Sequence, residues 1–286
     1  MNNILITGGT GFVGSHMIDY ILKHETDVKI FVTKRWMEDT KNVDHVDDKR
    51  FEFVDCDLLD GLSVERAVQI SKPNKVFHFA AQSFPEVSFK TPVITLQTNV
   101  IGTTHLLESI KNSDYNPVIV SISSSEVYGM PKEDEIPIKE DNPIRAANPY
   151  SISKVGHDLM SQYYHNAYDM KIIITRMFSH EGARRGKQFA LSSFAHQIVQ
   201  NEKGNGDGFI RHGNLESVRT YNHIEDAIRA YWICSESDRF GEIYNIGGDY
   251  TCKVGDTLDM LLSMSTLLDL KPLLDSDRVR PTDITL

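Results

Sequence analysis

Asn3-Ile4-Leu5-Ile6-Thr7-Gly8-Gly9-Thr10-Gly11-Phe12-Val13-Gly14 begins the chain with a short apolar strand and a glycine-rich turn. Apolar residues at helical spacing follow over residues 15–23. Glycines at these spacings permit a tight turn, close approach of the backbone to a pyrophosphate and close packing of helix on strand. The free N–H groups at the start of the helix favour phosphate. This context predicts dinucleotide binding rather than a structural turn, through Gly8, Thr10, Gly11, Phe12, Val13 and Gly14.

Strand and helix patterns then alternate along the chain. Strands are predicted at 28–32, 51–54, 75–79 and 117–122, and helices at 91–112 and 149–168. This alternation predicts an α/β fold with a Rossmann doubly wound parallel sheet, which binds ligands at the carboxyl ends of its strands.

The residues at those strand ends bear on the choice of cofactor. An NAD site places an Asp or Glu about twenty residues after the glycines, at the end of the second strand. This chain has Lys34 and Arg35 there, which suit a 2′-phosphate, so we predict NADP with NAD as the alternative. Asp57, next to Leu58, is placed to bind the adenine amino group, and Ala80, Ala81 and Gln82 let a cofactor lie against the fourth strand.

The second half predicts further helices at 187–203, 224–235 and 254–268, and a strand at 242–246 that adds to the sheet. We expect Tyr231, Trp232, Met260 and Met264 to lie in the core. The predicted domains are a dinucleotide-binding domain over 1–177, with the added strand, and a smaller, mostly C-terminal ligand-binding domain over 178–286.

The composition narrows the functional classes. The 286 residues are 40% hydrophobic and carry a formal net charge of -10, which argues against non-specific nucleic-acid binding. The three cysteines, Cys56, Cys234 and Cys252, have neither disulfide nor metal-ligand spacing, so we predict reduced thiols and no metal site. No apolar run reaches the length of a membrane span, and the chain enters a strand without a signal peptide. A cytoplasmic protein without membrane contacts is expected.

Tyr150 and Lys154 lie four residues apart on the first turns of the helix predicted at 149–168, so their side chains share one face. A nearby ammonium favours the phenolate, and Tyr150 could then exchange a proton with a sugar hydroxyl near neutral pH. The spacing alone is far more typical of an ordinary helix pair. Ser124 and Glu126, at the end of the fifth strand, favour the catalytic interpretation.

These motifs occur in an order and spacing similar to the extended short-chain dehydrogenase/reductase family over nearly the whole chain. The resemblance rests on the glycine turn, Asp57-Leu58, the stretch 78–82, Asn99 before Gly102-Thr103, the stretch 124–129 and the Tyr150/Lys154 pair. It implies that Tyr150 is the catalytic acid/base, that Lys154 binds the nicotinamide ribose and lowers the tyrosine pKa, and that Ser124 hydrogen-bonds the reacting oxygen. Asn99 is assigned to the cofactor site on the same ground.

Three segments resemble the GDP-mannose 4,6-dehydratases more closely: 176–186, 213–219 and 278–283. The last two are also similar to the sister reductases of the 4-keto-6-deoxy sugar nucleotide. Serines stand at 179 and 124 where the dehydratase pattern has asparagine and threonine. The resemblance implies cofactor contacts from His180 and Arg185, diphosphate contacts from Arg219 and Arg280, and further substrate contacts from Ser83, Ser124, Glu126, Ser179 and Asn214.

The expected reaction converts GDP-mannose to its 4-keto-6-deoxy product, with Glu126 as the base at C5. Alternatives are an NADPH-dependent reductase of that product, a sugar-nucleotide 4-epimerase and a non-catalytic NADP-binding sensor. The resemblance also implies a homodimer or homotetramer formed through the helices at 91–112 and 149–168, with the basic loop 35–42 reaching a neighbouring subunit. Relatives continue beyond the position of Leu286, so a truncated substrate domain is expected.

Overall fold

The computed structural model describes residues 2–282 and is built around a seven-stranded sheet in which every pairing is parallel. The inner strand β1, which lies between β4 and β2, has the continuous buried run Ile4, Leu5 and Ile6, as expected for a strand covered on both faces. The strands in spatial order are β10 (Ile243–Ile246), β6 (Ile172–Met177), β5 (Val118–Ile122), β4 (Lys75–His78), β1 (Asn2–Thr7), β2 (Val28–Lys34) and β3 (Phe51–Asp55).

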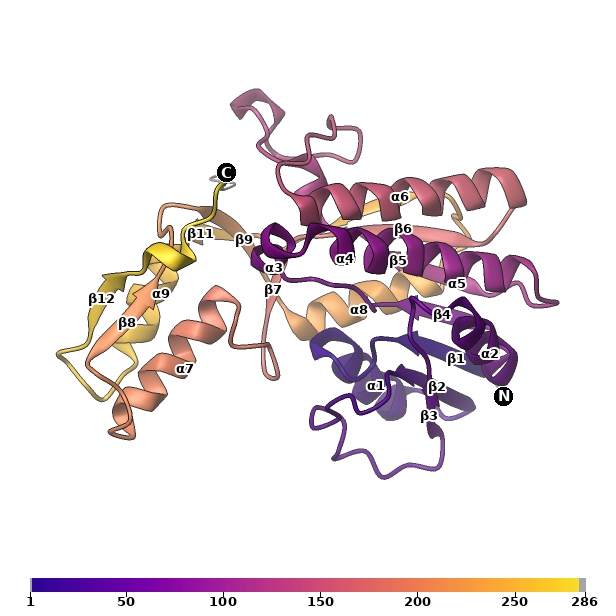
Figure 1. Cartoon of the computed structure of the whole chain (residues 1–286), viewed down its shortest axis with the longest axis horizontal. Helices are drawn as coiled ribbons and strands as arrows, with labels where there is room; N and C mark the ends of the chain where they lie inside the picture. The colour runs from indigo at the N-terminus through magenta and orange to yellow at the C-terminus, as the bar shows by residue number, and fades with distance from the viewer. Residues whose placement is uncertain (1, 283–286) are drawn as a thin grey trace.

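Helices cover both faces of the sheet, which confirms the predicted doubly wound fold (Figure 1). One face packs against α1 (Phe12–His24) and α8 (Ile224–Ser235). The other packs against α2 (Gly61–Ser71), α5 (Gly102–Lys111) and α6 (Pro149–Tyr168). The strand predicted at 242–246 joins the sheet as β10, beside β6.

The helix predicted at 91–112 is divided in the structure. It consists of α4 (Pro92–Leu96), the π-helical turn η1 (Gln97–Ile101) and α5. The π turn contains Asn99, which is 1% exposed. Asn99 makes two hydrogen bonds to the Gln82 backbone: the Asn99 Nδ2 donates to the carbonyl oxygen (2.9 Å), and the Asn99 Oδ1 accepts from the N–H (2.8 Å). This local change in winding places a polar side chain beside the end of β4, as π turns commonly do near functional sites.

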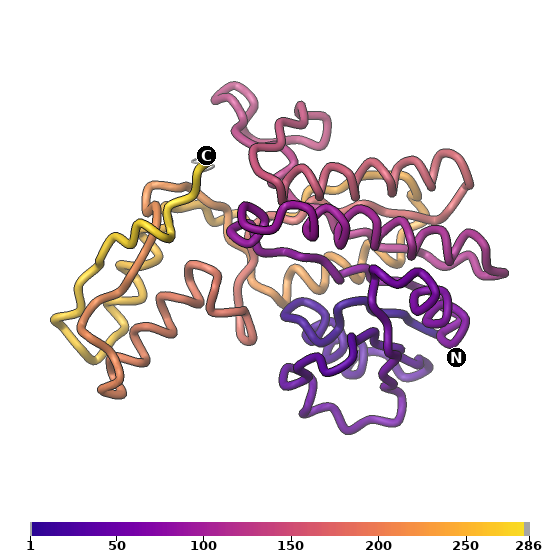
Figure 2. Tube along the Cα trace, viewed as in Figure 1, coloured from indigo at the N-terminus to yellow at the C-terminus, as the bar shows by residue number. Residues whose placement is uncertain are grey.

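The C-terminal segments form a separate lobe beside the carboxyl edge of the sheet (Figures 1 and 2). Phe194, Ile198, Ile210, Val254 and Leu258 make its buried cluster. Its larger elements are α7 (Ala190–Glu202), β8 (Phe209–His212), α9 (Val254–Ser263) and β12 (Lys271–Leu274). The lobe is connected to the main sheet by a three-stranded sheet of β7 (Ser179–Glu181), β9 (Val218–His223) and β11 (Tyr250–Lys253). The remaining elements are short helices: α3 (Pro85–Lys90), η2 (Ser125–Tyr128), η3 (Glu133–Glu135) and η4 (Ser276–Arg278).

Two predictions for α9 were wrong. The helix ends at Ser263 rather than near residue 268, and Met260 and Met264 are 49% and 74% exposed instead of lying in the core. The buried side of α9 is made by Val254 and Leu258. Met260 continues the apolar pattern on a side of the helix that the lobe leaves uncovered, and Met264 follows the end of the helix. Tyr231, by contrast, is fully buried as predicted. Over residues 2–282, none of the helices has the length and apolarity to cross a membrane.

Candidate active site

A cavity of about 830 Å³ lies at the carboxyl ends of the central strands, with the C-terminal lobe on its other side. The sheet contributes Gly8, Ala80 and Ser123 to its lining, and the lobe contributes Phe194 and Asn214. Every residue predicted for the cofactor, substrate or catalytic site lines this cavity except Thr10 and Asn99. Thr10 is 4% exposed and Asn99 is 1% exposed; they contact Glu38 and Gln82, respectively, which do line the cavity.

The glycine turn is packed so tightly that side chains are excluded. Gly8 has φ +68°, and a Cβ there would lie 2.8 Å from the backbone of Ala80. A Cβ on Gly14 would lie 2.5 Å from the Gly8 oxygen. The N-cap of α1 is Gly11, which makes no side-chain capping bond, so the N–H groups at this helix start remain open to a ligand. The turn therefore fits a pyrophosphate.

The end of β2 differs from the prediction made for it. Lys34 Nζ lies 2.8 Å from Asp55 Oδ1, so its charge is already paired. Arg35 is more exposed, and its Nε lies 3.5 Å from Glu38 Oε2. Glu38 also lines the cavity, and sequence reasoning missed it. An acid about twenty residues after the glycines could have indicated this position, but Glu38 lies in the loop beyond the end of β2.

Ser124 and Glu126 lie where the chain leaves β5, and Tyr150 and Lys154 lie on α6; all four line the cavity. Asn148 connects the two segments. It is the N-cap of α6, accepting from the Ser151 N–H (2.8 Å), while its Nδ2 donates to Glu126 Oε2 (2.9 Å). The Asn-Pro start explains why α6 begins here, because an N-cap side chain and a proline at N1 both favour a helix start. Asn148 is a second residue that sequence reasoning left without a role.

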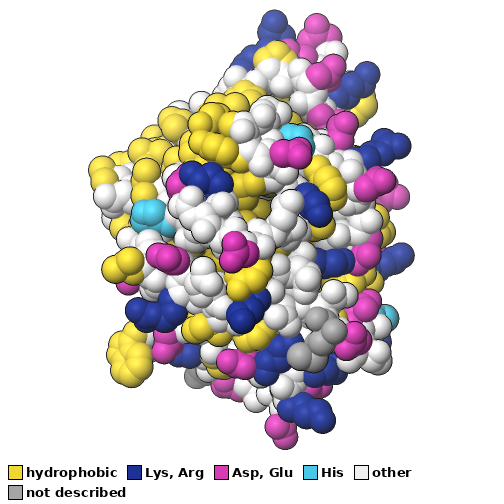
Figure 3. Space-filling view, turned by 90° about the vertical axis from the view of Figure 1, so that its right-hand side faces the viewer, with side chains coloured by type: hydrophobic (Ala, Val, Ile, Leu, Met, Phe, Trp, Pro, Cys, Tyr) yellow, Lys and Arg dark blue, Asp and Glu magenta, His cyan; other side chains and the backbone are white. Residues whose placement is uncertain are grey.

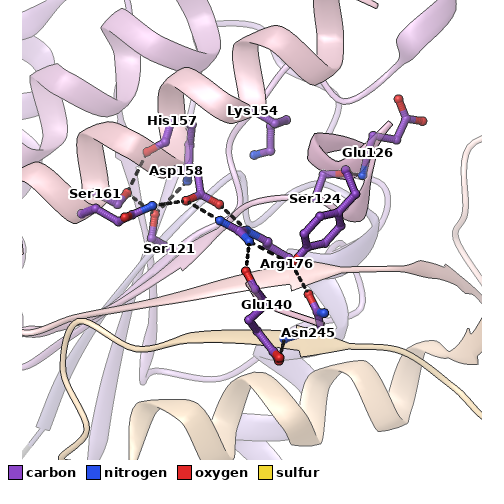
Figure 4. A network of polar contacts seen from close by, with 12 residues as sticks. Ser121, Ser124, Glu126, Glu140, Lys154, His157, Asp158, Ser161, Arg176 and Asn245 are labelled. Carbon is purple, nitrogen blue, oxygen red and sulfur yellow. Dashed lines mark hydrogen bonds and ion pairs between the residues drawn. The ribbon is translucent and has the colours of Figure 1, made fainter. Parts of the chain in front are cut away.

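Burial controls the proton affinities of the Tyr150/Lys154 pair. Burial raises the pKa of Tyr150 and the Glu126 carboxylate raises it further, whereas the Ser124 hydrogen bond and the Arg185 guanidinium lower it. Burial lowers the pKa of Lys154 to about 8. Lys154, predicted to lower the Tyr150 pKa, is not among these influences, and its ammonium donates to the Ile122 carbonyl oxygen (2.5 Å). Figure 4 shows Lys154 with Ser124 and Glu126.

A buried ion pair supports this part of α6. The Arg176 Nε donates to Asp158 Oδ2 (2.9 Å), one turn beyond Lys154, and the two residues are 2% and 0% exposed. Arg176 also donates to the Tyr128 hydroxyl (2.8 Å) and to the Glu140 carbonyl oxygen (2.9 Å). Figure 4 shows Arg176 at the centre of these contacts, with Asn245 of β10 beside it. The network therefore connects α6 to the neighbouring strands β6 and β10.

Two polar atoms with no hydrogen-bond partner, His180 Nε2 and the Tyr231 hydroxyl, lie on another part of the cavity wall. Arg185 lines the same part, and its Nε makes no hydrogen bond but lies 3.6 Å from Glu181 Oε2. The Arg185 guanidinium lies 5.0 Å from the Phe12 ring and 3.8 Å from the Phe189 ring. Burial, reinforced by the Arg185 charge, lowers the pKa of His180 to about 4, so this imidazole is neutral at physiological pH. Buried polar atoms without partners fit a polar ligand. Tyr231 was expected only as a core residue.

Ser83 lines the cavity after β4, and four more predicted substrate residues lie on the C-terminal side: Ser179, Asn214, Arg219 and Arg280. Arg278 lines the cavity as well, although only its neighbour Arg280 was predicted. It donates to Ser193 Oγ (3.0 Å) and pairs with Asp275 (3.2 Å), which holds the segment against α7. Of the segment 278–283 that carried the resemblance, Asp283 lies outside the described residues.

The sequence and structure were compared with known proteins. A family model described as GDP-mannose 4,6 dehydratase matches residues 5–272. The dTDP-D-glucose 4,6-dehydratase of Dictyostelium discoideum is 28% identical in an alignment of 281 positions that covers 93% of this chain but 62% of that protein. The GDP-6-deoxy-D-mannose reductase of Pseudomonas aeruginosa is 26% identical over 97% of this chain and 84% of that protein.

The crystal structure of DesIV, a dTDP-glucose 4,6-dehydratase from Streptomyces venezuelae with NAD bound, has a TM-score of 0.84 at 26% identity, covering 98% of this chain and 88% of that one. The fold, the glycine turn and the sequence match therefore indicate the same family over almost the whole chain. The chain accordingly belongs to the GDP-mannose 4,6 dehydratase family, within the extended short-chain dehydrogenases/reductases, as predicted.

Proposed function

We propose that this protein is a sugar-nucleotide 4,6-dehydratase that acts on GDP-mannose with a bound nicotinamide cofactor. The main support is the position of Glu126, whose carboxylate lines the same cavity as Ser124, Tyr150 and Lys154 and is held by Asn148 (2.9 Å). A dehydratase needs a base at C5 in addition to the group at O4, and the cavity offers one for each. Cofactor binding is supported by the glycine turn, which fits a pyrophosphate, and by the polar atoms near Arg185 that have no hydrogen-bond partner.

The chemistry divides among the side chains of the cavity. A nicotinamide cofactor held on the glycine turn would supply the hydride acceptor for C4 and the hydride donor for C6. Tyr150 takes the O4 proton as the C4 ketone forms, with Ser124 hydrogen-bonded to that oxygen. Glu126 removes the C5 proton, which the ketone makes acidic, and the C6 hydroxyl leaves as water after gaining a proton. A proton returns to C5 to complete the product. Acid/base groups of this kind contribute about 10²–10⁴-fold each.

The substrate would extend from Tyr150 and Glu126 toward the C-terminal lobe. Arg219 and Arg280 line that end of the cavity, and guanidinium groups suit the oxygens of a diphosphate. Asn214, Ser179 and Ser83 add polar contacts along the way. The guanine base is proposed from the family description alone. This arrangement also supports the proposed division near residue 177 into cofactor-binding and sugar-nucleotide-binding domains.

We also propose that the protein forms a homodimer through α4 and α6, which pack side by side. Their outward residues include Val93 (65% exposed), Ile152 (51%), Leu159 (52%) and Tyr163 (49%). Figure 3, which looks at the end of the molecule where α6 finishes, shows hydrophobic side chains gathered at its upper left. An apolar surface of this kind is typical of an interface between subunits.

One alternative has specific support. A reductase of the 4-keto-6-deoxy sugar nucleotide needs Tyr150, Lys154 and Ser124 but no C5 base, and the Pseudomonas aeruginosa reductase matches nearly the whole chain. The proposals differ in what Glu126 does, because the reductase leaves it without a catalytic task.

The test is incubation of the purified protein with GDP-mannose and catalytic amounts of NAD or NADP, followed by mass spectrometry. We expect a product lighter by one water, and its loss in Glu126→Gln. Glu135→Gln is the matched control, because Glu135 pairs with Arg145 (2.6 Å) and does not line the cavity. No product from GDP-mannose, together with NADPH or NADH oxidation by the 4-keto-6-deoxy sugar nucleotide, would establish the reductase instead.

A further inference from the structure

The end of the described chain forms a strap, residues 278–282, between the C-terminal lobe and the main domain. The strap leaves the lobe after β12 (Figure 2). At its far end the Thr282 hydroxyl donates a hydrogen bond to the Ala147 carbonyl oxygen (2.8 Å), 135 positions earlier in the sequence. Arg280, at the middle of the strap, lines the cavity. The strap therefore joins the two walls of the cavity, with Arg280 between its two attachments.

The lobe holds the beginning of the strap. The Arg278 Nη1 donates to Ser193 Oγ of α7 (3.0 Å), and the Arg278 Nε pairs with Asp275 (3.2 Å). The backbone of Arg278 also lies against Gly213, because a Cβ on Gly213 would lie 2.5 Å from the Arg278 oxygen. Glycine lets the two segments come this close. The first residue of the strap is therefore fixed to the lobe.

The other end of the strap rests on a well-braced turn of the main domain. Ser151 Oγ accepts hydrogen bonds from the N–H groups of Ala147 and Asn148 (3.0 Å each), and the Ser151 N–H donates to Asn148 Oδ1 (2.8 Å). Asn148 also donates to Glu126. Ala147 precedes the N-cap of α6, so its carbonyl oxygen lies outside the hydrogen bonds of the helix. Thr282 thus binds an acceptor whose position is fixed.

The hydrogen bond from Thr282 is exposed and joins two neutral groups, so it adds little to the stability of the whole chain. Its effect on Arg280 is more direct, because it holds the strap two residues beyond that side chain. A guanidinium that is already held in place binds a diphosphate with a smaller loss of conformational entropy than one on a free segment. The contact therefore favours the arrangement of the strap that binds phosphate.

We propose that Thr282 is a positioning residue for substrate binding: its hydroxyl fastens the strap to Ala147 and keeps Arg280 over the diphosphate of the sugar nucleotide. This inference rests on the proposed function, since it assumes that the cavity holds a sugar nucleotide. Glu126 keeps its own hydrogen bond from Asn148 whatever the strap does. The strap therefore changes how tightly the substrate binds and leaves the rate of the chemistry as it is.

The experiment compares the full wild-type chain with Thr282→Val, which replaces the hydroxyl with a methyl group of similar size. Isothermal titration with GDP should give a dissociation constant about 2–10-fold higher for the variant, as one neutral hydrogen bond allows. The KM for GDP-mannose should rise by a similar factor while kcat stays within about twofold. Thr282→Ser should restore both values. Thr266→Val is the matched control, because it removes a hydroxyl that bonds Glu202 (3.2 Å) and does not line the cavity.

Limited trypsin digestion adds a measurement that needs no activity. Trypsin cuts after Arg278, whereas Pro281 protects the bond after Arg280. GDP should slow the cut after Arg278 more in the wild type than in Thr282→Val. Equal protection of the two proteins would contradict the proposed attachment of the strap.

An unchanged GDP affinity in Thr282→Val would overturn the inference, and so would an equal loss of NAD⁺ affinity, which would indicate a general structural effect. If the wild type makes the dehydratase product while the variant binds GDP normally, only the inference fails. If the wild type binds dTDP instead of GDP, the proposed substrate fails, and dTDP then tests the strap in the same titration. Binding of no nucleoside diphosphate would overturn the proposed function and the inference with it.

Discussion

Tyr150 is 8% exposed. Burial and the Glu126 carboxylate raise the pKa of its phenol, whereas the Ser124 hydrogen bond and the Arg185 charge lower it. Because burial dominates, the free protein holds this group as a neutral phenol at physiological pH. Its use as a base therefore depends on what the cavity adds when cofactor and substrate bind. This balance makes the residue the most direct test of the proposed chemistry.

Replacing Tyr150 with Phe removes the hydroxyl and leaves the ring. We expect the dehydratase rate to fall by about 10²–10⁴-fold, since the acid/base group at O4 is lost. Nucleotide affinity measured by titration should stay within a few-fold of the wild type. Tyr163→Phe, on an exposed part of the same helix, is the control and should retain its rate. A Tyr150→Phe variant as active as wild type would exclude Tyr150 as that group.

Asn148 acts on the reaction through Glu126, so it is a positioning residue. Replacing it with Ser keeps an N-cap side chain but removes the Nδ2 donor to Glu126. The free energy of unfolding should change by less than about 1 kcal/mol, because serine caps helices nearly as well as asparagine. The dehydratase rate should fall about tenfold, as expected when one charge-assisted hydrogen bond is lost. Urea titration and initial rates separate the two effects, and an unchanged rate would rule out the positioning role.

At the scale of elements, α6 is anchored to β6 by the ion pair of Arg176 with Asp158. Arg176→Met should leave the Asp158 charge buried without an opposite charge, with the Gln162 amide (2.6 Å) still donating to it, and lower the free energy of unfolding by about 3–5 kcal/mol. Adding Asp158→Asn to that variant should recover part of the loss, because no charge is then buried. Urea unfolding of the three proteins measures both changes. Equal stability of the single and double variants would contradict this account of the pair.

His78 of β4 and His157 of α6 stack in the core, with ring centroids 5.4 Å apart. Burial lowers the pKa of His78 to about 3 and lowers that of His157 in the same direction. Both folded-state pKa values lie below the unfolded value of 6.5, so unfolding takes up protons as the pH falls through 6.5. The stability from neutral imidazoles is complete above that pH and is lost progressively below it.

Between about pH 6.5 and about pH 5, each buried histidine should reduce the free energy of unfolding by about 2 kcal/mol. His157→Gln should therefore decrease the pH dependence over this interval by about 2 kcal/mol, whatever its effect at neutral pH. The measurement is urea unfolding at both pH values. His196→Gln, at an exposed position on α7, should leave the dependence as in the wild type. An unaltered dependence in His157→Gln would show that another group causes it.

At the scale of the whole molecule, the apolar surface of α4 and α6 predicts self-association. Leu159→Lys places a charge on that surface, and we expect it to convert a dimer to a monomer at micromolar concentration in sedimentation velocity. Leu62→Lys, at a more exposed position on α2 (72% exposed), is the control and should leave the dimer intact. A wild type that sediments only as a monomer would disprove the proposed interface.

The local patterns of the sequence predicted most of the fold. The strand, glycine turn and helix at the start of the chain and the later alternation of strands and helices were confirmed, including β10 as an added strand of the sheet. These predictions succeed because burial on both faces of a parallel sheet leaves continuous apolar runs, and turns leave glycines, which are readable over a few residues. The helices at 149–168 and 224–235 were predicted to the residue.

The finer organisation of the site was decided only by the tertiary structure. Glu38 meets Thr10 across 28 residues of sequence, Asn148 meets Glu126 across 22, and Arg176 meets Asp158 across 18. Hydrophobic periodicity and strand ends predict the element on which a side chain lies. Which partner the side chain contacts depends on how segments distant in the sequence pack together. For the same reason the sequence showed two cations at the end of β2, whereas the structure shows those cations paired and a carboxylate between them and the glycine turn.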